Sequence, residues 1–229
     1  EEIAEDILRW RKASPNVEWF WGGQTRGKAN GPVVNDSRPP LSVNWRGEPD
    51  RWDRTPYYFG AEGMAVLAIS NPGESYEITR MDGSGSGVSY RVVDDVLYCT
   101  LPSGRSIAYH RPRLRESERG GRSISFESWN TNPKNGPMGW IRMDTWGGRL
   151  VENIVQATAR DILRHAMVNL ERFGYPIVLH VYDEIVSEVL EGVGTVEQLE
   201  AIMAAMPAWA AGWPIKAAGG WRAKRYRKG

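Results

Sequence analysis

Two neighbouring acids, Asp183 and Glu184, lie between two runs of apolar residues that otherwise favour buried strands. Carboxylates beside buried strands are costly unless they are paired or bind a cation. Mg²⁺ prefers oxygen ligands of this kind, and phosphoryl transfer often uses two such ions about 4 Å apart. The pair therefore indicates a candidate catalytic and metal-binding site, and a plain polar hairpin turn is the alternative.

Upstream of these acids, four polar residues recur at a spacing that places them on one face of a helix: Arg149, Asn153, Gln156 and Arg160. Amide and guanidinium groups on such a face can donate hydrogen bonds to phosphates and to base edges in a DNA groove. A solvated helix face is the alternative for this pattern. The four residues are candidates for DNA binding.

The elements that must position these groups fall in residues 148–229, the most regular part of the chain. Helical periodicity from Arg149, followed by Gly174 and Pro176, predicts a long helix that ends at Phe173. The run PIVLHVYDEIVSEV then predicts two strands that meet at Tyr182-Asp183-Glu184. The sequence therefore predicts a β-hairpin that carries the two acids and packs on the long helix.

A second helix and a last strand are expected after this hairpin. Thr195 and Gln198 form a capping-box pattern, which predicts that a helix begins there, and Pro207 is expected to close it. The segment PIKAAGGW is expected to form a terminal strand. Residues 148–229 thus read as helix, hairpin, helix and strand.

The remainder of the chain has two other sequence patterns. Residues 1–23 are predicted to be a helical entry segment, with a second short helix that begins at Ser14-Pro15. Residues 24–147 are rich in Gly, Pro and Trp and contain the β-like runs VSYRVV, VLYCTL, SIAYH and SISFE, so antiparallel strands and long loops are expected there. The predicted fold class is therefore α+β.

Composition excludes several other kinds of site. The chain is 41% hydrophobic with a net charge of +1, which fits a globular protein and says nothing of acidic partners. Cys99 is the single cysteine, so a disulfide within the chain and a multi-cysteine zinc site are excluded. Since no apolar run approaches the roughly 20 residues of a membrane helix, no membrane partner and a cytoplasmic location are expected.

Several segments together resemble the family A, polymerase I-like DNA polymerases, with the phage members most similar. The run QATARDILRHAM followed by VLHVYDEIVSEV resembles the family's Q-G-T-A-A-D-I helix and its V-H-D-E hairpin, called motif C. The segments SPNV, LYCTLPSGRSIAYHRPRL and PIKAAGGW resemble further family segments, whereas residues 40–95 look enlarged or divergent. The resemblance implies that residues 148–229 are the C-terminal part of a polymerase palm, with an antiparallel palm-like sheet.

The resemblance also implies roles for single residues and ligands. Asp183 would bind the catalytic Mg²⁺ ions with help from Glu184, Gln156 would contact the DNA minor groove near the primer terminus, and Arg105 matches an arginine-rich turn only in part. Primer-template DNA and a deoxynucleoside triphosphate would be the partners. Tyr182 stands where the family usually has histidine, and its phenol can still donate a hydrogen bond to the primer-end phosphate.

The family's motif A, D-Y-S-x-x-E-x-R, and its fingers motif, R-x-x-x-K-x-x-x-F-x-x-x-Y-G, are not found in the chain. Because two-metal catalysis needs both carboxylate sites, we expect the isolated chain to be inactive and the metal site to be completed by a carboxylate from another segment or subunit. An expressed fragment, a split gene and a decayed remnant all fit this pattern.

Two other classes of function are open at this point. A non-catalytic DNA-binding module would use the same helix face and the basic tail that follows Pro214. A carbohydrate- or protein-binding β-domain is suggested by the 11 Trp residues and the Gly/Pro-rich middle of the chain, although most tryptophans are core residues. Binding to DNA that is independent of Asp183 would favour the first of these, and binding to sugars would favour the second.

Overall fold

The computed structural model describes residues 23–25, 57–80, 84–116 and 122–224, and the chain divides into two compact units, Glu1–Val155 and Gln156–Gly229. Helix α4 (Gly147–Arg172) runs through the division. The predicted helical entry segment lies outside the described residues up to residue 22. Each unit is considered by itself.

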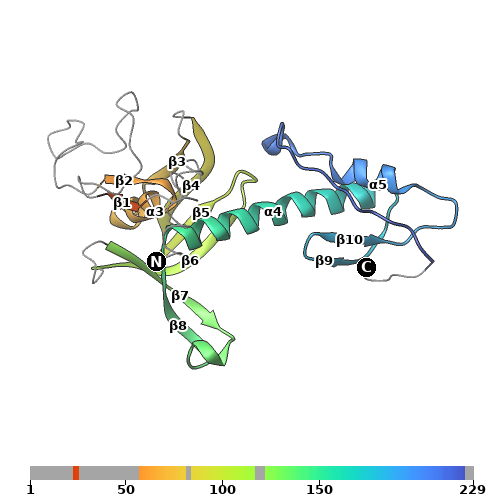
Figure 1. The fold of residues 1–229 in the computed structure, drawn as a ribbon. Coiled ribbons are helices and arrows are strands. Elements are labelled where there is room, and N and C mark those ends of the chain that lie inside the picture. The colour runs from red at the N-terminus through yellow and green to blue at the C-terminus, as the bar shows by residue number, and fades with distance from the viewer. Residues whose placement is uncertain (1–22, 26–56, 81–83, 117–121, 225–229) are drawn as a thin grey trace, which may run out of the picture. The chain divides into compact units, whose positions relative to one another are not determined.

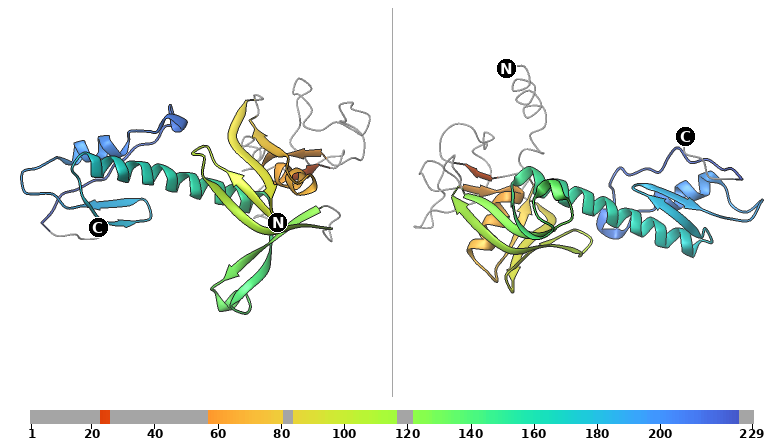
Figure 2. Two further views of the ribbon diagram at one scale, coloured as in Figure 1. Left: turned by 180° about the vertical axis from the view of Figure 1, so that it is seen from behind. Right: turned by 90° about the horizontal axis from the view of Figure 1, so that it is seen from below.

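The first unit is built around a six-stranded antiparallel sheet with the order β3-β4-β5-β6-β7-β8 (Figure 1). Its strands are β3 (Ser75–Thr79), β4 (Gly85–Val93), β5 (Val96–Thr100), β6 (Ser106–Glu116), β7 (Arg122–Asn130) and β8 (Gly139–Thr145). Strands β7 and β8, joined through the short helix η1 (Pro133–Asn135), reach beyond the other strands as a twisted ribbon (Figures 1 and 2). The four strands predicted from β-like runs are confirmed as β4 to β7.

The sheet has one buried and one open face, because side chains alternate along each strand. Directly paired residues share a face, so the pairs Tyr90–Cys99 and Leu97–Tyr109 place these four side chains on one side, where all are buried. Ile124 and Phe126 continue this face, with Phe126 edge-to-face against Tyr109 at 5.0 Å between ring centroids. Here lies the apolar core of the unit.

Helix α3 (Gly60–Ser70) contributes to the same core, next to a small sheet of β1 (Gly23–Thr25) and β2 (Tyr57–Phe59). Sequence reasoning missed this helix and expected only strands and loops across residues 24–147. The reason is physical: the sequence GAEGMAVLAIS is apolar on nearly every side, and most of its residues are buried. A helix without a polar face leaves no periodic signal in the sequence.

Glu62 links α3 to the start of α4. Its Oε2 accepts a hydrogen bond of 3.0 Å from the backbone N–H of Gly147, the first residue of α4. Burial raises the pKa of the Glu62 carboxyl, and the hydrogen bond from Gly147 opposes that rise only in part. The ionised carboxylate is therefore less favourable in the folded chain than in the unfolded chain.

The pH dependence of stability provides a test of this link. Since the folded pKa is raised, the contribution of Glu62 to stability is fully present below the ordinary pKa near 4.5 and falls as pH rises through the folded value. Glu62→Gln retains an acceptor for Gly147 and removes the titration, so its free energy of unfolding should exceed that of the wild type increasingly toward neutral pH. Denaturant unfolding across this range measures the difference, with Glu74→Gln on an exposed turn as control. Parallel pH profiles for the wild type and Glu62→Gln would contradict the assignment.

The second unit contains the C-terminal half of α4, the hairpin of β9 (Ile177–Val181) and β10 (Glu184–Ser187), helix α5 (Val196–Met203) and the short helix η2 (Ala208–Ala210). The capping box of α5 is confirmed: the Gln198 N–H donates to the Thr195 hydroxyl at 3.1 Å, and the Thr195 N–H donates to the Gln198 side chain at 3.2 Å. The hairpin turns back along α4 (Figures 1 and 2).

Two predictions for this unit need correction. Helix α5 ends at Met203, before Pro207, and the expected terminal strand at PIKAAGGW is not formed. Glycine and alanine have weak strand propensity, and β9 and β10 pair only with each other among the described strands. The segment is held instead by single contacts, such as the Gly220 N–H that donates to Glu200 Oε1 at 2.9 Å.

Within the described ranges, no helix combines the length and the apolar character that crossing a lipid bilayer requires.

Candidate active site

Asp183 and Glu184 lie at the turn of the β9–β10 hairpin. Val181 pairs with Glu184, so Tyr182 and Asp183 alone form the connecting turn. Both acids are exposed, and the side chain of Tyr182 is 92% exposed. The carboxylates are therefore open to solvent and accessible to a cation or a large ligand.

Several hydrogen bonds fix the base of this hairpin against the end of α4. The Ile177 N–H donates to Glu171 Oε1 at 2.7 Å, and the Tyr175 N–H donates to the Leu170 carbonyl at 2.9 Å. The Ser187 hydroxyl donates to the Tyr175 carbonyl at 3.4 Å. Tyr175 is buried, and both its N–H and its carbonyl are hydrogen-bonded, so the base of the hairpin is fixed to the end of α4. The two acids lie at the opposite end of the hairpin.

The four polar residues predicted to bind DNA all lie on α4, but they have different surroundings. Gln156 and Arg160 are exposed and belong to the same unit as the hairpin. Arg149 donates to the Asp144 carbonyl at 3.2 Å, and Asn153 donates to the Tyr109 hydroxyl at 3.0 Å, both inside the first unit. Asn153 thus ties α4 to the sheet. DNA binding by these residues stays a prediction.

The donor set at the hairpin consists of carboxylate oxygens, which suit a hard cation such as Mg²⁺. Among the residues that the structure describes, no group of three or more His, Cys, Asp or Glu side chains is arranged to hold a metal ion. Asp183 and Glu184 could therefore supply some ligands of a cation site, with water or another segment supplying the others.

Cys99 does not provide a nucleophile. Its thiol is fully buried in the sheet, and burial raises its pKa to about 12. Because the thiolate is the reactive form, burial disfavours Cys99 as a nucleophile, and its side chain packs in the core.

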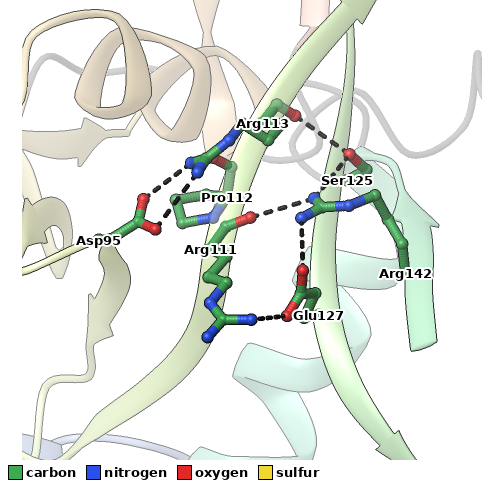
Figure 3. A network of polar contacts seen from close by, with 7 residues as sticks. All are labelled: Asp95, Arg111, Pro112, Arg113, Ser125, Glu127 and Arg142. Atoms are coloured by element: carbon green, nitrogen blue, oxygen red, sulfur yellow. Dashed lines mark hydrogen bonds and ion pairs between the residues drawn. The ribbon is translucent and has the colours of Figure 1, made fainter. Parts of the chain in front are cut away.

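Sequence reasoning missed a polar network on the open face of the sheet, which Figure 3 shows. Arg113 binds Asp95 through two hydrogen bonds of 2.7 and 3.3 Å, and these lower the pKa of the Asp95 carboxyl. Glu127 lies between two guanidinium groups, with Arg111 at 2.7 Å and Arg142 at 3.0 Å. The alternation of Arg111, Arg113 and Arg115 along β6 is the signal in the sequence that could have indicated it.

The turn residue Tyr182 has a φ of +51°, in the left-handed region that β-carbon atoms disfavour. Asparagine tolerates this conformation, and little buried area is lost because the tyrosine ring is exposed. We expect Tyr182→Asn to raise the free energy of unfolding by about 1 kcal/mol. Tyr182→Ala also removes the ring, but alanine has no amide that can hydrogen-bond to the local backbone, so this variant should give no gain. Urea unfolding of the three chains measures the difference, and equal effects of Asn and Ala would contradict the strain.

Comparison with known proteins gives one clear relation. The chain is 41% identical over 134 residues to a protein named DNA polymerase from Bacillus phage SP02, and the match covers 58% of this chain. The same match covers 20% of the phage protein, so the chain spans about a fifth of that relative. No family model matches the chain, and no solved structure matches it. Over the matched part, the chain is a homologue of a phage DNA polymerase.

Proposed function

We propose that this chain is the C-terminal palm part of a family A DNA polymerase and contributes to template-directed nucleotidyl transfer. The observation that carries the proposal is a pair of adjacent, exposed carboxylates at the turn of a β-hairpin, in a chain homologous to a DNA polymerase. In the reaction, the primer 3′-hydroxyl attacks the α-phosphate of a deoxynucleoside triphosphate, and pyrophosphate leaves.

Each hairpin residue then has a role that follows from its chemistry. Asp183 would bind Mg²⁺ through its carboxylate, and Glu184 would add a second oxygen ligand or orient a bound water. Bound Mg²⁺ supplies stabilisation of the charge that develops on the phosphoryl oxygens. The Tyr182 hydroxyl can donate a hydrogen bond to the phosphate at the primer end.

Gln156 would act on the duplex. Its amide is exposed on α4 in the same unit as the hairpin, and an amide can donate to the acceptors that every base pair presents in the minor groove. Such a contact positions the primer terminus without reading its sequence, as replication requires. Arg160, one helical turn further along and also exposed, is placed to contact the phosphate backbone.

The rest of the polymerase would complete the site by docking on β9. Within the described part of the chain, β9 pairs only with β10, so its outer edge has no strand partner. Along this edge strand, Val178 is 58% exposed, Leu179 44% and Val181 37%. Exposed apolar edge strands invite pairing with a further strand. We propose that a segment with motif A pairs there and brings the second metal-binding carboxylate.

A chimera tests this function directly. In the phage polymerase, the segment that matches this chain is replaced by the chain itself, and primer extension is assayed with and without Mg²⁺. We expect Mg²⁺-dependent extension from the chimera and none from the isolated chain. A chimera that folds and binds primer-template DNA with full affinity, yet never extends a primer, would favour a non-catalytic DNA-binding module.

A further inference from the structure

We propose that the open face of the six-stranded sheet binds single-stranded DNA by stacking a base on Trp140 and reading its edge in the adjoining cleft. This inference deepens the proposed function and rests on it, because a polymerase must handle a single-stranded template. The residues involved are outside the Asp183 hairpin and belong to the first unit alone.

The cross-strand pairs define which side chains lie on this face. Val96 pairs with His110, His110 with Glu127, and Glu127 with Arg142, while Trp129 pairs with Trp140 further along the β7–β8 ribbon. Directly paired residues point to the same side of a sheet. These residues therefore share the face opposite the core, and we call Trp129, Trp140 and His110 the aromatic cluster.

The aromatic cluster is exposed but ordered by contacts among its own rings. Trp129 is 58% exposed and Trp140 is 57% exposed. Their ring centroids lie 5.9 Å apart at 87°, and His110 lies 5.5 Å from Trp140 at 80°. Large apolar rings that a folded sheet leaves in water mark a binding surface, and edge-to-face packing restricts their motion before a ligand arrives.

A cleft of about 350 Å³ adjoins Trp140, and several of the residues that line it are charged. It is bounded by His110, Arg111, Glu127 and the β4–β5 turn at Asp94 and Asp95. A volume of this size is typical of small-ligand sites. Beside the flat ring of Trp140, the cleft thus offers both hydrogen-bond donors and acceptors, as the edge of an unpaired base requires.

A bulge in β6 aims the polar groups into this cleft. The register shifts between His110 and Arg113, and Arg111 has a φ of +48°, which is uncommon for a residue with a side chain. The Arg111 N–H donates to the Asp95 carbonyl at 2.8 Å. As Figure 3 shows, Arg142 donates to the Arg111 carbonyl, at 3.1 Å. Two bonds therefore hold a strained position that directs the Arg111 side chain to Glu127.

Charge and shape favour a single strand over a duplex. Around the cleft, the guanidinium groups of Arg111, Arg113 and Arg142 are paired with Glu127 and Asp95, so these three arginines offer little unbalanced positive charge to a phosphate backbone. Affinity must come from stacking, and bases inside a duplex are not available to stack. Charged side chains line the cleft, and an apolar anchor residue of a protein partner would have to take them out of water.

The test is binding of a fluorescently labelled single-stranded oligonucleotide of mixed sequence to the full chain, followed by anisotropy. We expect Trp140→Leu to weaken binding about 10-fold or more, whereas Trp140→Phe, which retains an aromatic face, should remain within about threefold of the wild type. Trp209→Ala is the matched control, because Trp209 and Trp213 form a similar edge-to-face pair in the second unit. Equal affinities of the Leu and Phe variants, in chains with unchanged circular dichroism, would overturn the proposal.

Competition and salt separate the possible ligands. The same sequence as a duplex should compete poorly, and the logarithm of affinity should fall with the logarithm of salt concentration with a slope of about one or less, since few phosphates are neutralised. The single-strand proposal is overturned if a duplex competes equally or if a soluble oligosaccharide displaces the strand from Trp140.

Failure of this proposal is distinct from failure of the proposed function. Asp183→Ala should leave single-strand binding unchanged while it abolishes extension by the chimera. Binding without extension would leave the stacking face in place and contradict the palm assignment. If Trp140→Leu impairs neither extension nor single-strand binding, the palm assignment stands and the stacking face is contradicted.

Discussion

Asp183→Asn is expected to abolish primer extension by the chimera, with a loss of about a thousandfold or more in rate. Asparagine has the same shape and still accepts a hydrogen bond, but it lacks the charge that a divalent cation requires from this ligand. A cation of this kind contributes several kcal/mol to the stabilisation of developing charge, and about 1.4 kcal/mol corresponds to each factor of ten. The loss should appear in the rate of the chemical step, measured in single-turnover primer extension.

Two comparisons make the Asp183 result specific. Glu184→Gln should reduce the rate less, because Glu184 begins β10 and is proposed as the assisting ligand. Glu188→Gln changes an exposed carboxylate just beyond the same hairpin and should leave the rate unchanged. If Asp183→Asn and Glu188→Gln extend primers equally, Asp183 does not bind a catalytic cation and the hairpin is only a turn.

Elements with a strong local signal could be predicted from the sequence, and α4 is the clearest example. Its expected range, 149–173, differs little from the observed Gly147–Arg172, because apolar periodicity marks its length and Gly174 ends it with a φ of +80°. The β9–β10 hairpin and the Thr195 cap were predicted for the same reason. Each depends on residues that are neighbours in the chain.

Features that depend on distant residues could not be predicted in this way. Helix α3 has no polar face, and its burial depends on strands that follow it in sequence. The terminal strand was expected at PIKAAGGW, yet no strand forms there, although the outer edge of β9 has no strand partner among the described strands. Whether a segment pairs depends on its fit to a distant strand as well as on its own residues. At the candidate site, the DNA contact predicted for Asn153 stays a prediction, and the structure adds a hydrogen bond from its amide to Tyr109, a contact that no helix pattern contains.

The polar network on the open face also depends on residues that are distant in the sequence. The sequence contains Arg111, Arg113 and Arg115 in alternation, but only the β6–β7 and β7–β8 registers bring Glu127 between Arg111 of β6 and Arg142 of β8. The bulge at Arg111 shifts that register by one residue and could not be read from the strand pattern alone. Its effect on charge is direct: burial acts to raise the pKa of Glu127, but Arg111 and Arg142 outweigh it and lower that pKa.

The division of the sheet into two faces predicts that substitutions on adjacent strand positions affect different properties. Leu97 on β5 is fully buried on the core face, so Leu97→Ala should reduce the free energy of unfolding by about 3 kcal/mol through lost contacts and a residual cavity. Val93, on the neighbouring strand, is 38% exposed, and Val93→Ala should cost less than about 1 kcal/mol. Denaturant unfolding measures both.

Substitutions on the two faces should also have opposite effects: one should weaken DNA binding and spare stability, and the other should lower stability and spare binding. Trp140→Leu on the open face should leave the unfolding transition close to that of the wild type, because more than half of the ring is already in water at 57% exposure. Leu97→Ala should instead lower the stability of the fold while its remaining folded fraction binds single-stranded DNA normally. A Leu97→Ala chain as stable as the wild type would mean that the two faces are not separated by burial, and the stacking surface would then lose its structural basis.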